Sequence, residues 1–215
     1  TARASDAETA RIAADLARQA RDLLGPGDPS GAATRAVAAA VAGVALNGRA
    51  GERLLDRALS RLSRALPATL GADGGHASRQ GSAALELLFD LETLDEAMVQ
   101  RGLAAPDAVQ RAIDRLAAAV RFYTLADGAL ATGHRGPPRT ARYVGAVRAQ
   151  DETGDRPTGS GLGGYQRMES LRLQVIADVA PPPAGAWSAG AADAPLSMQV
   201  LVGGRRLIDP AAGRS

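Results

Sequence analysis

Cysteine and lysine are both absent from this chain of 215 residues, and aromatic residues make up only 3% of it. Without cysteine, the chain can form no disulfide and offers no thiolate for catalysis or metal binding. Without lysine, all 25 basic side chains are arginines, which favour bidentate contacts with carboxylate or phosphate groups. Because aromatic residues are scarce, a hydrophobic core must be built from leucine, valine and alanine.

Long apolar runs and a strong net charge are also lacking. No run approaches the ~20 apolar residues needed to cross a bilayer, so we expect no transmembrane segment. No apolar run follows residues 1–5, so we expect no signal peptide in the chain as given, and the missing initiator Met suggests a segment of a longer protein. The 25 basic and 23 acidic residues nearly cancel, to a formal charge of +2, which argues against nucleic acid as a partner.

Apolar residues recur at helical spacing through the first half of the chain. The clearest case has Leu55 and Leu62 on one face and Arg57 and Arg61 on the other. The segment 32–46 is apolar on nearly every side, so this helix must be buried among others. The pattern predicts five helices, near residues 5–24, 32–46, 51–66, 82–102 and 106–127.

The period changes to two after about residue 140. Leu173, Val175 and Ala177 alternate with Gln174 and Asp178, which predicts a strand whose leucine and valine side is buried. A second alternation covers residues 196–202, and the glycine pair that follows it predicts a hairpin to residues 205–208. The second half of the chain is therefore predicted to be an antiparallel β region.

The fold class that follows is α+β and multidomain. We expect a helical domain over residues 1–135, a linker or long connecting loop over 136–164, and the start of a β domain over 165–215. The strands are too few to cover both faces of a sandwich, so we expect truncation or an exposed sheet edge.

One loop concentrates residues suited to binding. Gly74 and Gly75 allow a positive φ and a close approach to a ligand. His76, one of two histidines, can transfer protons near neutral pH, and Asp73 and Arg79 flank it with opposite charges. The alternative is structural: His76 hydrogen-bonds to the loop backbone and shapes the turn.

Several motifs follow one another along the chain: Gly51–Leu55, Asp73–His76 with Arg79, Ala112–Leu116, Arg121–Tyr123, Asp127–Gly128, Gly164–Met168, Leu196–Gln199 and Arg206–Pro210. In this order, across a change from helices to strands, they resemble the heparinase II/III family of polysaccharide lyases. The resemblance implies an α/α toroid followed by an antiparallel β-sandwich.

The resemblance also implies a chemistry, the β-elimination of acidic, uronate-containing polysaccharides. A base removes the proton next to the uronate carboxylate, while a cationic or amide group neutralises that carboxylate. The implied catalytic residues are His76 and Tyr165, and the implied substrate-binding residues are Asp73, Gly74, Gly75, Arg79 and Trp187. No cofactor is implied; Asp209 matches a position that ligates a metal in some family members. The implied location is the bacterial periplasm or cell envelope.

The chain departs from the family at three places. Ala83 stands where the family has a tyrosine base, no histidine precedes Leu196, and no Asn-His pair lies near Ser30. Two interpretations stay open: a lyase whose catalytic residues are degenerate, or a catalytically inactive glycan-binding or structural cell-envelope protein of the same fold. The resemblance favours an enzyme, and the departures leave that open.

Three further residues have two interpretations each. Tyr165 could turn its hydroxyl toward a cleft between domains or pack as a strand aromatic, and Trp187 could stack on a sugar ring or cover the sheet. His134 lies in a loop rich in glycine and proline, where a solvated histidine is expected rather than a catalytic one.

Overall fold

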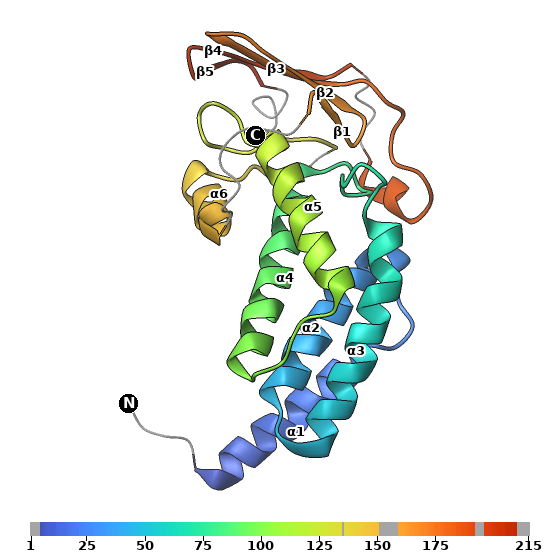
Figure 1. Ribbon diagram of the computed structural model, residues 1–215. Helices are drawn as coiled ribbons and strands as arrows, with labels where there is room; N and C mark the ends of the chain where they lie inside the picture. Colours follow the sequence, from blue (N-terminus) through green and yellow to red (C-terminus); the bar gives the residue numbers. More distant parts are fainter. Residues whose placement is uncertain (1–4, 135, 151–158, 192–195, 210–215) are drawn as a thin grey trace. The chain divides into compact units, whose positions relative to one another are not determined.

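A computed structural model describes residues 5–134, 136–150, 159–191 and 196–209 (Figure 1). The described residues form helices and then a five-stranded antiparallel sheet, which confirms the α+β class. They group into two compact units. Unit 1 comprises Thr1–Pro67 and Asp90–Gln110, and unit 2 comprises Ala68–Phe89 and Arg111–Ser215. Among the helices described, none combines the length and the apolar character needed to span a bilayer.

The helices of the first half lie close to their predicted positions. They are α1 (Asp6–Leu23), α2 (Ala32–Ala45), α3 (Gly48–Thr69), α4 (Gly81–Gln100) and α5 (Asp107–Tyr123), with a 3-10 turn, η1 (Pro29–Gly31), before α2. A capping box begins α1: the Ser5 N–H donates to Glu8 Oε2 at 2.8 Å, and the Glu8 N–H donates to Ser5 Oγ at 3.3 Å. The third helix was expected to end near residue 66, but α3 continues through Pro67 to Thr69. The φ of proline is helical, and the only backbone bond it removes lies in the last turn.

The core of unit 1 is centred on α2. Most of its alanines and valines are buried, but Ala38 and Ala45 are exposed, so the helix is not covered on every side as its apolar pattern predicted. Gly43 makes close packing on α3 possible, since a Cβ there would lie 2.7 Å from the Leu55 backbone nitrogen. The face of α3 that carries Leu55 and Leu62 is buried, and the face that carries Arg57 and Arg61 is exposed, also as predicted.

In unit 2 the sheet is a simple meander. Its strands are β1 (Gly161–Leu162), β2 (Tyr165–Glu169), β3 (Leu173–Asp178), β4 (Met198–Val202) and β5 (Arg205–Ile208), and each pairs with the next. The segment 136–164, expected to be a linker or loop, contains α6 (Ala141–Val147), the 3-10 turn η2 (Arg148–Gln150) and β1. A further 3-10 turn, η3 (Gly185–Gly190), lies between β3 and β4.

The sheet buries the opposite face from the one we predicted. In β3 the buried side chains are Gln174, Ile176 and Asp178, whereas Leu173 is exposed. The polar residues occupy the buried positions because they form specific hydrogen bonds there, which are described below. The other face carries apolar side chains that are mostly exposed or partly exposed, with Val200 buried at 8%: Met168, Leu173, Val175, Ala177, Met198, Val200, Val202 and Ile208.

Hydrogen bonds join the buried face of the sheet to the loop after α5. The Ala126 N–H donates to Gln174 Oε1 at 2.7 Å, and Gln199 Nε2 donates to the Thr132 carbonyl at 2.6 Å. The α5 end and its loop belong with the sheet in unit 2.

Candidate functional site

The loop that carries His76 packs against the turn between β1 and β2. Asp73 accepts two backbone hydrogen bonds, from Gly75 at 2.9 Å and from Gly163 at 2.6 Å. A Cβ on Gly75 would lie only 2.8 Å from the Gly163 Cα, and Gly74 has a φ of +89°, which favours glycine. The close backbone approach expected from the glycine pair is therefore made to the protein's own chain.

Arg79 lies at the centre of this contact. Its guanidinium is buried, the residue being 8% exposed, and its five N–H groups all have acceptors. Nε donates to the Gly163 carbonyl at 2.8 Å, Nη1 to the carbonyls of Ala180 at 3.0 Å and Pro181, and Nη2 to the Gly164 carbonyl at 3.0 Å and the Asp178 carboxylate. In this arrangement, Arg79 has no N–H group left to bind a substrate carboxylate.

Asp178 bridges Arg79 and His134. The residue is 2% exposed; its Oδ1 pairs with Arg79, and its Oδ2 lies 3.0 Å from His134 Nε2. His134 was expected to be solvated, but it is buried, because the Asp178 carboxylate gives its ring a polar partner inside unit 2. The result is a buried cluster of three ionisable groups, Arg79, Asp178 and His134.

Two tyrosines complete the surroundings of Arg79. The Tyr165 hydroxyl donates to the Arg79 carbonyl at 3.1 Å, and the Tyr165 ring lies 5.0 Å from Arg79 Cζ. The Tyr123 ring meets the Tyr165 ring edge-on, with centroids 5.6 Å apart. Burial raises the pKa of both tyrosines, so both stay protonated at neutral pH. Tyr165 thus packs as a strand aromatic, with its hydroxyl bonded to protein backbone.

His76 makes separate contacts within the same loop. The Ser78 N–H donates to His76 Nδ1 at 3.2 Å, and the Ser78 hydroxyl lies 2.7 Å from that nitrogen. Burial lowers the His76 pKa to about 4, so the ring is neutral at pH 7, and its Nδ1 acceptor role assigns the proton to Nε2. Trp187 is partly buried and packs edge-on against this ring, with centroids 5.0 Å apart.

Asp209, the residue at a possible metal position, pairs with an arginine. Arg206 donates from Nη1 to Asp209 Oδ2 and from Nε to Asp127 Oδ2, both at 2.7 Å. Across the part of the chain that the structure describes, no three His, Asp or Glu side chains group as metal ligands would. A carboxylate already held by a guanidinium does not fit a metal ligand, so we derive no step through a metal.

The structure thus brings Asp73, Gly75, Arg79 and Tyr165 together around one turn and sets His76 against Trp187. Sequence reasoning missed the Asp178–His134 pair. Asp178 alternated with apolar residues, as a solvent-facing acid does, and nothing in the sequence marked it as buried. The scarcity of histidines was a signal that each one has a specific partner. The sequence alone does not show which of the acidic residues that partner is.

Comparisons with known proteins give two kinds of similarity, and no family model matches the chain. FtsZ-localized protein C of Caulobacter vibrioides (strain NA1000 / CB15N) is 45% identical over 209 residues, which are 96% of this chain and 36% of that protein. The chain therefore spans about a third of the length of that relative.

The structural similarity is to heparinase III. A crystal structure of heparinase III matches with a TM-score of 0.73 and 13% identity, over 90% of this chain and 36% of that one. A second heparinase III, the BT4657 gene product with methylated lysines, matches with a TM-score of 0.62 and 12% identity, over 83% and 31%. Identities this low show a shared fold alone.

Proposed function

We propose that this chain is a non-catalytic protein of the heparinase III fold, with a binding or structural role in the bacterial cell envelope. The single observation that carries the proposal is the saturation of Arg79. A lyase needs a cation or amide to neutralise the uronate carboxylate, and every N–H group of Arg79 already has an internal acceptor. In this proposal Arg79, with Asp73 and the glycines, holds the loop to the turn between β1 and β2 and binds no substrate.

His76 and Tyr165, which the family resemblance implied to be catalytic, are also poorly placed for proton transfer. The unprotonated nitrogen of His76 faces Ser78, so it is not open to a sugar proton, and the Tyr165 hydroxyl is bonded to the Arg79 carbonyl. Ala83, at the tyrosine position, supplies no base. These features support a loss of lyase activity with retention of the fold.

The partner class follows from the curated relative. FtsZ-localized protein C is named for its localization to FtsZ, and 45% identity over nearly the whole of this chain supports a related role here. We propose that the protein to which this chain belongs associates with FtsZ-containing assemblies. A periplasmic location remains a prediction from the family resemblance alone.

Glycan binding without cleavage is the second candidate. Trp187 favours it, because it is the chain's one tryptophan, is partly accessible and is held in place by the His76 ring. An ordered, partly exposed indole can stack on a sugar ring. Both candidate functions assume that the protein has the α/α toroid and β-sandwich of the family.

Two assays test the proposal on the purified full-length protein. The first incubates it with uronate polysaccharides and follows the ultraviolet absorbance of unsaturated products, with an active heparinase as positive control. The second measures co-sedimentation with FtsZ polymers formed with GTP. We expect no product and specific co-sedimentation. Product formation that depends on His76 would overturn the non-catalytic assignment, and no enrichment with polymers would overturn the FtsZ partner.

A further inference from the structure

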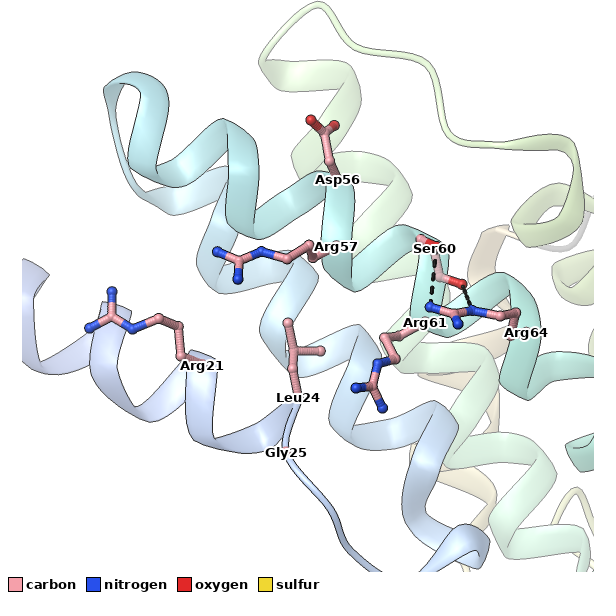
Figure 2. Close-up of a pocket in the computed structure, with 8 residues that line it drawn as sticks. All are labelled: Arg21, Leu24, Gly25, Asp56, Arg57, Ser60, Arg61 and Arg64. Atoms are coloured by element: carbon pink, nitrogen blue, oxygen red, sulfur yellow. Dashed lines mark hydrogen bonds between the residues drawn. The ribbon is translucent and has the colours of Figure 1, made fainter.

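A groove in unit 1 runs between the end of α1 and the exposed face of α3 (Figure 2). Its volume is about 460 Å³, within the range of ligand-binding clefts. The residues that matter for its chemistry are Arg21 and Leu24 on the α1 side, and Asp56, Arg57, Arg61 and Arg64 on α3. No residue of the loop described above takes part.

The charges of this groove are unbalanced. Four arginines line it and only one acid, Asp56, does so. On α3, Arg57, Arg61 and Arg64 follow at spacings of four and three residues, which place them side by side on one helix face. Like charges at this spacing repel each other and weaken the helix. A bound anion would remove that cost.

The arginines are oriented so that donors remain available. Arg57 Nε donates to the Arg53 carbonyl and Arg64 Nε to the Ser60 carbonyl, both at 3.1 Å. Arg64 also donates from Nη2 to Ser60 Oγ at 3.4 Å (Figure 2). Among the described residues, both terminal nitrogens of Arg57 and Nη1 of Arg64 therefore remain without a hydrogen bond. Within the described ranges, the side chains of Arg21 and Arg61 have neither a hydrogen bond nor an ion pair.

The length of the groove and its combination of charged and apolar residues indicate which class of ligand fits it. Arg57 and Arg64 are separated by seven residues, a rise of about 10 Å on a helix, which equals about three residues of extended peptide. Leu24 adds an apolar surface, and Asp56 opposes a uniformly negative chain. Asp56 disfavours a chain with a charge on every unit, whereas Leu24 favours a ligand that places an apolar side chain between its charged groups.

We propose that this groove binds an acidic peptide segment of a protein partner, in which two or three carboxylates flank an apolar side chain. The carboxylates pair with the arginine forks, and the apolar side chain packs on Leu24. The inference goes beyond the proposed function, because it concerns a surface of the other unit and holds whether or not the protein acts on glycans.

The test uses fluorescence anisotropy with a labelled peptide of repeating Glu-Leu-Asp and a matched peptide of repeating Gln-Leu-Asn. The acidic peptide is expected to bind the full-length protein, with weakening on added salt, and the amide peptide is expected not to bind. The double variant Arg57→Gln, Arg61→Gln should bind the acidic peptide at least about fivefold more weakly, from the loss of two partly exposed charge pairs. Circular dichroism should show an unchanged fold, because both side chains are exposed.

The matched control is the double variant Arg11→Gln, Arg49→Gln, which removes the same charge from exposed positions of α1 and α3 outside the groove. It should retain most of the affinity. Equal binding of the two peptides, or equal weakening by both double variants, would overturn the proposal. Tighter binding of a uronate oligosaccharide at Arg57 and Arg61 would also overturn it and assign the groove to glycans. A lyase assay is unaffected by any of these results.

Discussion

The guanidinium of Arg79 and the carboxylate of Asp178 form a buried ion pair between residues 99 positions apart in the sequence. Arg79 belongs to the loop between α3 and α4, and Asp178 ends β3. The pair therefore fixes a loop of the helical half to the sheet inside unit 2. Burying an arginine is tolerable here because each of its donors has an acceptor.

Replacement of this arginine should destabilise the protein severely. In Arg79→Met the side chain keeps much of its volume, but Asp178 loses its guanidinium partner and four backbone carbonyls lose a donor. We expect the free energy of unfolding to fall by about 3–5 kcal/mol, as for other broken buried ion pairs. Urea denaturation followed by circular dichroism measures it. Arg115→Met, at an exposed site of α5, is the control, and a similar loss in both variants would contradict a structural role of Arg79.

The two buried tyrosines should respond differently to loss of the hydroxyl. Among the described residues Tyr123 Oη has no hydrogen-bond partner, whereas Tyr165 Oη donates to the Arg79 carbonyl at 3.1 Å. Tyr123→Phe removes an unsatisfied polar atom and should leave stability unchanged or raise it by about 1 kcal/mol, while Tyr165→Phe should lower it by about 1 kcal/mol. The urea midpoints of the two variants give the comparison. A marked loss in Tyr123→Phe would reveal a partner for that hydroxyl.

Alanine at Gly164 should cost far more than alanine at another glycine with the same backbone handedness. Gly164 has a φ of +79°, and a Cβ there would lie 2.6 Å from the Ala180 Cβ and 2.8 Å from Arg79 Nη2. Gly185 has a φ of +62° with nothing within 4 Å. Gly185→Ala should cost about 1–2 kcal/mol for the backbone alone. Gly164→Ala should exceed it clearly in thermal or urea unfolding, and equal costs would show that the close approach does not constrain the turn.

Acid should destabilise the fold partly through His76. Its folded pKa of about 4 lies below the ordinary 6.5, so between these values the unfolded chain binds a proton that the folded chain does not. The contribution of His76 to the free energy of unfolding is therefore fully present above pH 6.5. It is lost as the pH falls toward 4, by about 3 kcal/mol at most.

The variant His76→Asn isolates this contribution, because the asparagine oxygen can accept the Ser78 N–H without titrating. Urea unfolding from pH 7.5 to pH 4.5 should give a shallower loss of stability in the variant than in the wild type. The remaining slope belongs to other titratable groups of the chain. Parallel pH profiles would mean that His76 is as solvated when folded as when unfolded.

Helix positions were predictable from the sequence because each depends on neighbours within a few residues. The stripe of Leu55 and Leu62 against Arg57 and Arg61 fixed the buried face of α3, and the Ser5–Glu8 pair fixed the start of α1. Both signals are local, so no knowledge of distant contacts was required.

The orientation of β3 and the environment of His134 were not predictable for the opposite reason. Alternation reports that one side of a strand differs from the other, but Gln174 and Asp178 become the buried side only through bonds to Ala126, Arg79 and His134. Those partners lie 44 or more residues away. Likewise, Arg79 with Gly74 and Gly75 resembled a ligand site. A loop that binds a distant strand of its own chain uses the same residue types as a loop that binds an anion.

The long separation between Arg79 and Asp178 has a consequence for biosynthesis. At about 5–20 residues per second, the ribosome adds the 99 positions that separate them in about 5–20 seconds, during which the emerging loop has no acceptor for its guanidinium. Until β3 leaves the exit tunnel, the Arg79 loop cannot form its native contacts in unit 2. Stalled or prematurely terminated products that end before this strand should therefore be preferred substrates for chaperones and proteases.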